Sequence, residues 1–119
     1  MKVSFDFDGT LSEDFVQVIA KSMLDSGHDV WVITSRNEGH NWNMDVFETC
    51  LSIKLPLQKV IFTNGQLKQG EYARGGFELH FDNDWEEVSV INENGGHAIL
   101  INPDFEEIYS EMNYWRNEL

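Results

Sequence analysis

The sequence predicts a single α/β domain, residues 1–119, with a three-layer, Rossmann-like fold: a five-stranded parallel sheet with helices on both faces. Two observations support this prediction. Five short apolar runs alternate with segments of helical periodicity along the chain, and such an order produces a parallel sheet. Apolar residues make up 41% of the sequence, which is enough for one packed core.

The five predicted strands are short runs rich in β-branched and aromatic residues. The run 29–34 is apolar almost throughout, as expected of a strand that is covered on both faces. In the first run Phe5 and Phe7 alternate with Asp6, so Phe7 is expected to point into the core. The predicted strands are residues 2–7, 29–34, 59–63, 77–81 and 97–101.

Helical periodicity occupies the segments between these strands. Ser12 is the expected N-cap of the first helix, and Gly27 is expected to end it. Residues 88–91 would also suit a strand, because three of the four are β-branched. The predicted helices are residues 12–26, 44–51, 67–74 and 84–94, followed by an amphipathic tail from Pro103 to Leu119.

Charge and cysteine content exclude several classes of function. The net charge is −13, from 21 acidic residues against 8 Lys and Arg, and such a chain repels duplex nucleic acid and anionic membranes. Cys50 is the only cysteine, so an internal disulfide and a cysteine metal cluster are excluded; we expect it to be buried. No segment fits a signal peptide or a membrane span, so a cytoplasmic location is expected.

Polar residues suited to phosphoryl chemistry follow the predicted strands. In a parallel sheet the carboxyl ends of the strands share one edge, where ligands bind. Carboxylates, hydroxyls and cations are therefore expected to gather there. These residues are Asp6, Asp8, Gly9 and Thr10 after the first strand, Thr34, Ser35 and Arg36 after the second, Lys68 after the third, and Asp82, Asn83 and Asp84 after the fourth.

These residues form motifs that resemble those of the haloacid dehalogenase superfamily. The segment 5–11, Phe-Asp-Phe-Asp-Gly-Thr-Leu, resembles the first signature motif of that superfamily, and residues 32–36, Val-Ile-Thr-Ser-Arg, resemble the second. Lys68 resembles the third motif, and residues 80–84, His-Phe-Asp-Asn-Asp, the fourth. The first motif is specific and a lone lysine is not, so the resemblance depends on the shared order of all four.

The resemblance implies a role for each catalytic candidate. Asp6 would be the nucleophile that forms an aspartyl-phosphate, and Asp8 the general acid and then the general base. A second aspartate at this position favours a phosphatase over a dehalogenase. Thr34 would bind a phosphoryl oxygen, with Ser35 as the alternative hydroxyl, and Lys68 would neutralise the developing charge.

The resemblance also implies a magnesium site and a phosphate-binding turn. Mg²⁺ would be held by the Asp6 side chain, the Asp8 main-chain carbonyl and Asp82. Asn83 separates Asp82 from Asp84, and the sequence leaves open which of Asn83 and Asp84 completes the site. On the substrate side, Gly9 would permit the turn after the strand, with Thr10, Ser35 and Arg36 around the phosphate.

The substrate is not indicated by these motifs. The segments 10–29 and 64–77 each hold one helix, which leaves no room for the cap domain that selects substrates in larger relatives. The leading hypothesis is a phosphatase acting on a phosphomonoester, and a site without a cap leaves a large or nucleotide-like phosphorylated substrate open. The alternatives are a phosphatase for nucleotides or nucleic-acid ends, and a catalytically weak module that binds magnesium or phosphate. The aromatic tail around Tyr114 and Trp115 would suit a homo-oligomer.

Overall fold

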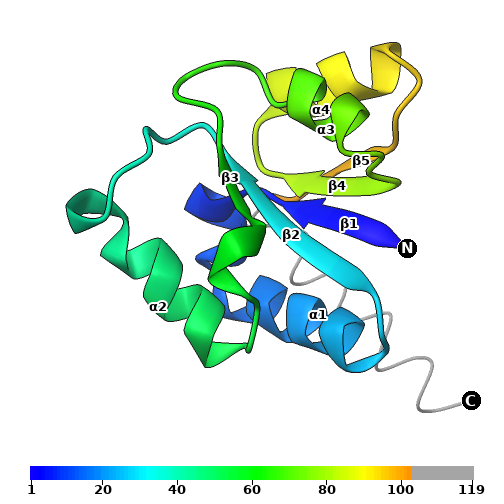
Figure 1. Cartoon of the computed structure of the whole chain (residues 1–119). Coiled ribbons are helices and arrows are strands. Elements are labelled where there is room, and N and C mark those ends of the chain that lie inside the picture. Colours follow the sequence, from blue (N-terminus) through cyan, green and yellow to red (C-terminus); the bar gives the residue numbers. More distant parts are fainter. Residues whose placement is uncertain (103–119) are drawn as a thin grey trace, which may run out of the picture.

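A five-stranded, all-parallel sheet forms the centre of the protein, in the strand order β3-β2-β1-β4-β5 (Figure 1). The computed structural model describes residues 1–102. The strands are β1 (Lys2–Phe5), β2 (Asp29–Thr34), β3 (Val60–Phe62), β4 (Leu79–Asp82) and β5 (Ala98–Leu100). The helices are α1 (Asp14–Asp25), α2 (Met44–Ser52), α3 (Gln69–Arg74) and α4 (Trp85–Glu93). The predicted α/β fold is confirmed.

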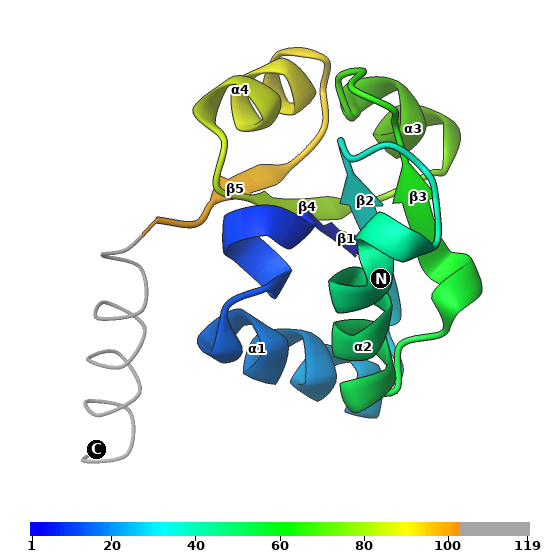
Figure 2. The ribbon, with the colours of Figure 1, turned by 90° about the vertical axis from the view of Figure 1, so that its left-hand side faces the viewer.

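The helices cover both faces of the sheet. Helices α1 and α2 lie on one face, and α3 and α4 lie on the other (Figure 2). Because β-strand side chains alternate, β2 and β3 supply side chains to two apolar cores, one on each face of the sheet. The larger core, on the α1 and α2 side, includes Val3, Phe5, Val30, Val32, Val46 and Cys50, and the smaller core contains Ile33, Tyr72, Phe77 and Ile91.

Connections between the strands are short in residues 1–102. The β1–β2 connection holds the helical turn Phe7–Leu11 and α1, and the β3–β4 connection holds α3 alone. No cap domain is therefore inserted at either of these places. In the same residues, none of the helices combines the length and the apolar character that crossing a bilayer requires.

The end of β1 differs from the prediction. The strand stops at Phe5, and Phe7 is buried, as expected, but from the helical turn Phe7–Leu11 instead of from a strand. The reason is the turn at Asp8 and Gly9, whose φ/ψ angles of −66°/119° and 74°/2° are those of a type II turn. A positive φ at the second position favours glycine, which explains Gly9.

Two expectations for the helices change as well. Helix α1 begins at Asp14 and is not capped by Ser12, whose hydroxyl instead accepts a hydrogen bond from the Gly9 amide at 3.0 Å. Residues 88–91 are helical, within α4. The predicted tail from Pro103 to Leu119 lies outside the described residues.

The strand order places a topological switch point between β1 and β4. The chain runs outward from β1 through β2 to β3 and then crosses to β4 on the other side of β1. In open α/β sheets, ligands bind beside such a switch point, at the carboxyl ends of the two strands. Asp6 follows β1 directly and Asp82 ends β4, so both acids lie at this switch point.

Candidate active site

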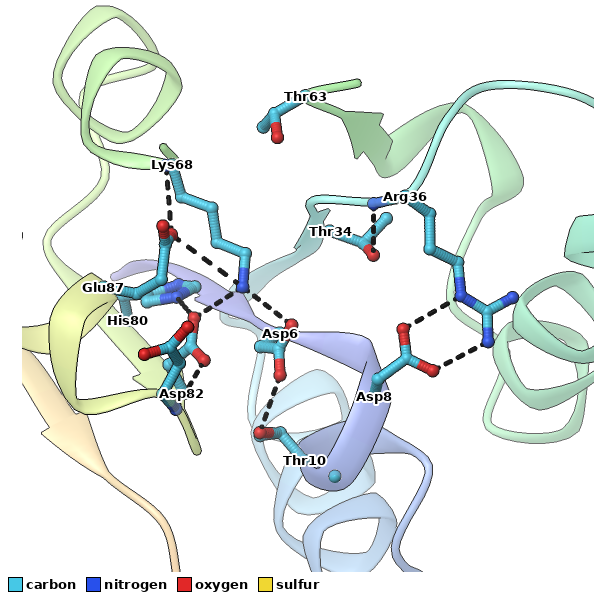
Figure 3. Close-up of polar contacts among 12 residues, drawn as sticks. Asp6, Asp8, Thr10, Thr34, Arg36, Thr63, Lys68, His80, Asp82 and Glu87 are labelled. Atoms are coloured by element: carbon cyan, nitrogen blue, oxygen red, sulfur yellow. Dashed lines mark hydrogen bonds and ion pairs between the residues drawn. The ribbon is translucent and has the colours of Figure 1, made fainter. Parts of the chain in front are cut away.

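The Lys68 ammonium group is the centre of the candidate site (Figure 3). It donates to Asp6 Oδ1 at 2.7 Å and to Asp82 Oδ2 at 2.7 Å, and it lies 3.9 Å from Glu87 Oε2. The side chain of Lys68 is 3% exposed, and those of Asp6, Asp82 and Glu87 are 7%, 0% and 7% exposed. One buried cation thus faces three buried carboxylates.

Lys68 itself is held in place by Glu87. The main-chain amide of Lys68, at the start of α3, donates to Glu87 Oε2 at 3.0 Å. Glu87 is the third residue of α4, where a glutamate usually bonds back to the N-cap of its own helix. Here it reaches across to the neighbouring helix and joins α3 to α4 at the site.

Behind Asp82, hydrogen bonds link the buried side chains of Asp82 and His80 on β4 to Ser4 on the neighbouring strand β1. His80 Nε2 lies 2.8 Å from Asp82 Oδ2, and His80 Nδ1 lies 2.7 Å from Ser4 Oγ. Burial outweighs the nearby carboxylate and lowers the pKa of His80, so the imidazole is neutral. Because the carboxylate only accepts, His80 donates from Nε2 and accepts at Nδ1 from the Ser4 hydroxyl. His80 is thus a satisfied strand residue that orients Asp82.

Burial and neighbouring charges shift the pKa values of Asp6 and Asp82 in opposite directions. Burial raises the pKa of Asp6 to about 7, against the attraction of Lys68 and with the repulsion of Asp82. Burial also opposes ionisation of Asp82, but the hydrogen bonds from His80 and Lys68 hold its pKa below the usual value. Burial opposes the charge of Lys68 too, yet Asp6 and Asp82 raise its pKa. The resting site therefore contains charged Lys68 and Asp82, with Asp6 near its titration point at neutral pH.

A group of oxygens adjoins the other side of Asp6. Asp6 Oδ2 accepts a hydrogen bond from the Thr10 hydroxyl at 3.1 Å. With its amide nitrogen turned inward, Asn83 donates to Asp6 Oδ2 at 2.9 Å and to the Asp8 carbonyl at 3.0 Å. Turning the amide over would instead present a third oxygen to the same place, and three oxygens suit Mg²⁺.

Gly9 makes room for this arrangement. A Cβ atom at position 9 would lie 2.1 Å from the end of the Asn83 side-chain amide, so a larger residue would displace Asn83 from Asp6 and Asp8. The positive φ of Gly9 and this close approach require the same small residue. The turn predicted at Gly9 is confirmed, and it brings the Asp8 carbonyl beside the Asp6 carboxylate.

Asp82 and Asp84 do not join this oxygen group. Asp82 Oδ2 accepts from Lys68 and His80, and its Oδ1 accepts from the Asp84 amide at 3.0 Å. Asp84 caps α4 by accepting from the Glu86 amide at 2.9 Å. Among residues 1–102, no three His, Cys, Asp or Glu side chains are grouped to hold a metal ion. The oxygen set beside Asp6 instead combines a carboxylate, a main-chain carbonyl and the Asn83 amide.

Asp8 and Arg36 pair with each other on the β2 side of the site (Figure 3). Arg36 Nε donates to Asp8 Oδ2 at 2.9 Å, and Arg36 Nη2 donates to Asp8 Oδ1 at 2.8 Å. Arg36 also donates to Asp45 through two nitrogens, at 2.8 and 2.9 Å. Each guanidinium nitrogen is therefore engaged by protein acceptors, whereas the sequence suggested Arg36 as a substrate ligand.

The two candidate hydroxyls lie in different surroundings. Thr34, the last residue of β2, is 1% exposed, and its Oγ1 accepts from the Arg36 amide at 3.3 Å. Ser35 is exposed, and its carbonyl accepts from the Gly65 amide at 2.8 Å. Thr34 therefore lies within the wall of the site, and Ser35 on its rim.

The candidate site lies at the carboxyl edge of the sheet, away from the groove between α3 and α4. A groove of about 520 Å³ lies between α3 and α4, but its lining residues Met1, Glu78 and His97 precede β1, β4 and β5, so it lies at the opposite, amino end of these strands. It is lined by Met1, Tyr72 and His97, among others, and by none of the candidate site residues. The position of the acids at the switch point, and not the volume of that groove, identifies the candidate site.

Sequence reasoning named Asp6, Lys68 and Asp82, which the structure brings together, but it missed Glu87 and Asp45. The sequence signal for Glu87 was its place as the third residue of α4, where a glutamate usually takes part in capping the helix. Asp84 already caps α4, so Glu87 is left without a role at the start of its own helix. For Asp45 the only signal was an acid in the first turn of α2, which is common for electrostatic reasons alone. Comparison with known proteins adds no assignment: no family model matches the chain, and no curated protein sequence matches it significantly.

The Asp6→Asn variant is expected to be more stable than the wild type at about pH 8 without metal, because asparagine keeps the shape but not the buried charge. Folding raises the pKa of Asp6 from 3.8 to about 7, so ionised Asp6 progressively lowers the free energy of unfolding as the pH rises through that range. The full shift corresponds to about 4 kcal/mol, an upper bound on the gain.

Urea unfolding in EDTA at about pH 8 and about pH 5 measures this effect. The stability gain of Asp6→Asn should be largest at the higher pH and should shrink at the lower one. Asp25→Asn is the matched control, since Asp25 is exposed and pairs with Lys21 on α1. A loss of stability in Asp6→Asn at both pH values would contradict the charge arrangement described above.

Proposed function

We propose that the protein is a magnesium-dependent phosphohydrolase that cleaves phosphomonoesters through an aspartyl-phosphate on Asp6. The observation that carries the proposal is the placement of Asp6 between Lys68, on one carboxylate oxygen, and the Asn83 amide and the Asp8 carbonyl, on the side of the other. A nucleophile, a cation and a set of metal-binding oxygens are what phosphoryl transfer to a carboxylate needs. The motif resemblance to the haloacid dehalogenase superfamily supports the same reaction.

In the first step, Asp6 Oδ1 would attack phosphorus while the bond from phosphorus to the leaving oxygen breaks. Asp8 would protonate that oxygen as it leaves. Lys68 would stabilise the negative charge gathering on the transferring group, because its ammonium already lies 2.7 Å from the attacking oxygen. The Thr34 hydroxyl would hold a phosphoryl oxygen from the β2 side.

In the second step, Asp8 would take a proton from water, which attacks the phosphorus of the aspartyl-phosphate. The bond between Asp6 and phosphorus then breaks, and inorganic phosphate leaves with the Asp6 carboxylate restored. Two carboxylates with different surroundings suit these two roles. Asp6 is buried and faces Lys68, whereas the Asp8 side chain is 61% exposed and accessible to water and to a leaving group.

Magnesium would be held by Asp6 Oδ2, the Asp8 carbonyl and Asn83 Oδ1, after the Asn83 amide turns over. When bound, it would supply positive charge to the phosphoryl oxygens and favour the ionised form of Asp6. Asn83 is suited to both states, because its NH₂ group satisfies the same two oxygens when no cation is present. Asp82 would act through Lys68 and not as a direct ligand.

Turnover of a generic aryl phosphate tests the proposal. The wild type should release phosphate with Mg²⁺ and lose activity in EDTA, and Asp6→Asn should be inactive under both conditions, because an amide cannot form the phosphorylated intermediate. Asp25→Asn, on the exposed surface of α1, should keep wild-type activity. Equal turnover by Asp6→Asn would exclude Asp6 as the nucleophile. Mg²⁺ or phosphate binding without turnover would favour a binding module.

The choice of Asn83 as a metal ligand gives a separate prediction. Asn83→Ala should weaken Mg²⁺ binding by at least about tenfold, since it removes one of three oxygen ligands. Asn83→Asp should strengthen binding but lower stability without metal, because a third carboxylate then faces Asp6 and Asp82. Isothermal titration with Mg²⁺ and urea unfolding in EDTA measure the two effects.

Asp84→Asn is the matched control for Asn83, because asparagine preserves the helix cap at position 84. Its affinity for Mg²⁺ should equal that of the wild type. If Asp84→Asn instead weakens binding and Asn83→Ala does not, the metal ligand is Asp84, and the oxygen set beside Asp6 has been assigned wrongly.

A further inference from the structure

We infer that Asp45 and Arg36 are positioning residues that fix the carboxylate of Asp8, the acid–base group of the reaction proposed above. The expected effect on reaction rates rests on that proposed function, whereas the positioning of Asp8 is argued from the hydrogen bonds alone. Neither residue would touch the substrate; Asp45 would act through Arg36, and Arg36 through Asp8.

The Asp8 carboxylate depends on Arg36. Its side chain is 61% exposed, and both of its oxygens accept from Arg36, at 2.8 and 2.9 Å. Among residues 1–102, no other side chain donates a hydrogen bond to this carboxylate. Two parallel hydrogen bonds from one guanidinium fix the plane of a carboxylate as well as its position. Without Arg36, an exposed aspartate would sample several rotamers.

Arg36 is in turn fixed from the side of α2. Its other contacts are a second pair of hydrogen bonds to Asp45, at 2.8 and 2.9 Å, and weaker ones to the Trp42 carbonyl at 3.2 Å and Asn43 Oδ1 at 3.3 Å. The guanidinium carbon also lies 5.1 Å from the centre of the Phe7 ring. The guanidinium group of Arg36 thus has the Phe7 ring against one face and hydrogen-bond acceptors along its edge.

The anchor of this chain of contacts is Asp45 at the start of α2. Asp45 lies in the first turn of α2, and its Oδ1 also accepts from the Val46 amide at 3.0 Å. Hydrogen bonding to Arg36 lowers the pKa of Asp45, so it is ionised at neutral pH. Asn43, which is fully buried, donates to the carbonyls of Asn37 and Gly39 at 2.9 and 2.7 Å and ties down the preceding loop.

This arrangement gives Arg36 a role different from substrate binding. Each of its nitrogens already donates to the protein, so a phosphate could bind it only by displacing one of these protein acceptors. The arrangement also explains why an arginine is present and not a lysine. A single ammonium group cannot bond two carboxylates in two fixed planes at once.

The kinetic test compares leaving groups. Asp45→Asn and Arg36→Lys should lower kcat/KM for an alkyl phosphate such as glycerol 2-phosphate by about tenfold, because an alkoxide needs a proton as it leaves. For 4-nitrophenyl phosphate, whose phenolate leaves without protonation, kcat/KM should change by less than about twofold. A general loss of structure would lower both rates equally. Asp25→Asn, an exposed acid paired with Lys21, is the matched control.

NMR of the Arg36 guanidinium provides a second test of the inference that does not depend on turnover. In ¹⁵N NMR, bidentate pairing slows rotation of the Arg36 guanidinium, so its Nη resonances should be resolved in the wild type. Asp45→Asn and Asp8→Asn should each collapse them, and Asp25→Asn should not. Collapse in a protein without phosphatase activity would uphold the positioning contacts and reject the proposed function. Unchanged resonances in Asp45→Asn, equal rate losses for both substrates, or a faster Asp45→Asn enzyme would overturn the inference.

Discussion

The Lys68 ammonium group joins parts of the chain that would otherwise repel one another. Asp6 follows β1, Asp82 ends β4 and Glu87 lies in α4, and all three carboxylates are buried within 3.9 Å of its nitrogen. Without that positive charge, their burial would cost several kcal/mol of free energy. Burial, together with the repulsion of Asp82, nevertheless raises the pKa of Asp6 to about 7 despite the attraction of Lys68. The ionised form of Asp6 is therefore disfavoured in the site, and the proposed Mg²⁺ would offset that cost.

The fold provides this arrangement through its strand order. Because β1 and β4 are neighbours at the switch point, the chain brings Asp6 and Asp82 together although they are far apart in sequence. Helices α3 and α4 then bring Lys68 and Glu87 from the same face of the sheet. On the other side of Asp6, the type II turn at Asp8 and Gly9 directs a carbonyl towards the Asn83 amide. The surroundings of the proposed nucleophile thus depend on the strand order on one side and on the turn after β1 on the other.

Much of this was predictable from the sequence, for identifiable reasons. Apolar runs and glycines predicted the five strands and four helices of residues 1–102, and the rule on strand ends predicted which residues gather. The predicted end of β1 was wrong, because the alternation of apolar and polar residues continues through Phe7, although the backbone has already left the strand. The choice between Asn83 and Asp84 depends on side-chain direction within one turn, which spacing does not encode. The partners of Arg36 depend on the path of the loop to α2, so Asp45 was not foreseen.

The central claim is that Asp6 is the residue on which a phosphoryl group is carried. A crystal structure of the protein with Mg²⁺ and beryllofluoride, a mimic of a phosphorylated carboxylate, tests it most directly. We expect beryllium bonded to Asp6 Oδ1, with Lys68 Nζ on a fluoride and Mg²⁺ between Asp6 Oδ2, the Asp8 carbonyl and Asn83 Oδ1. An adduct on Asp8, or no adduct at Asp6 when Mg²⁺ is bound, would contradict the claim.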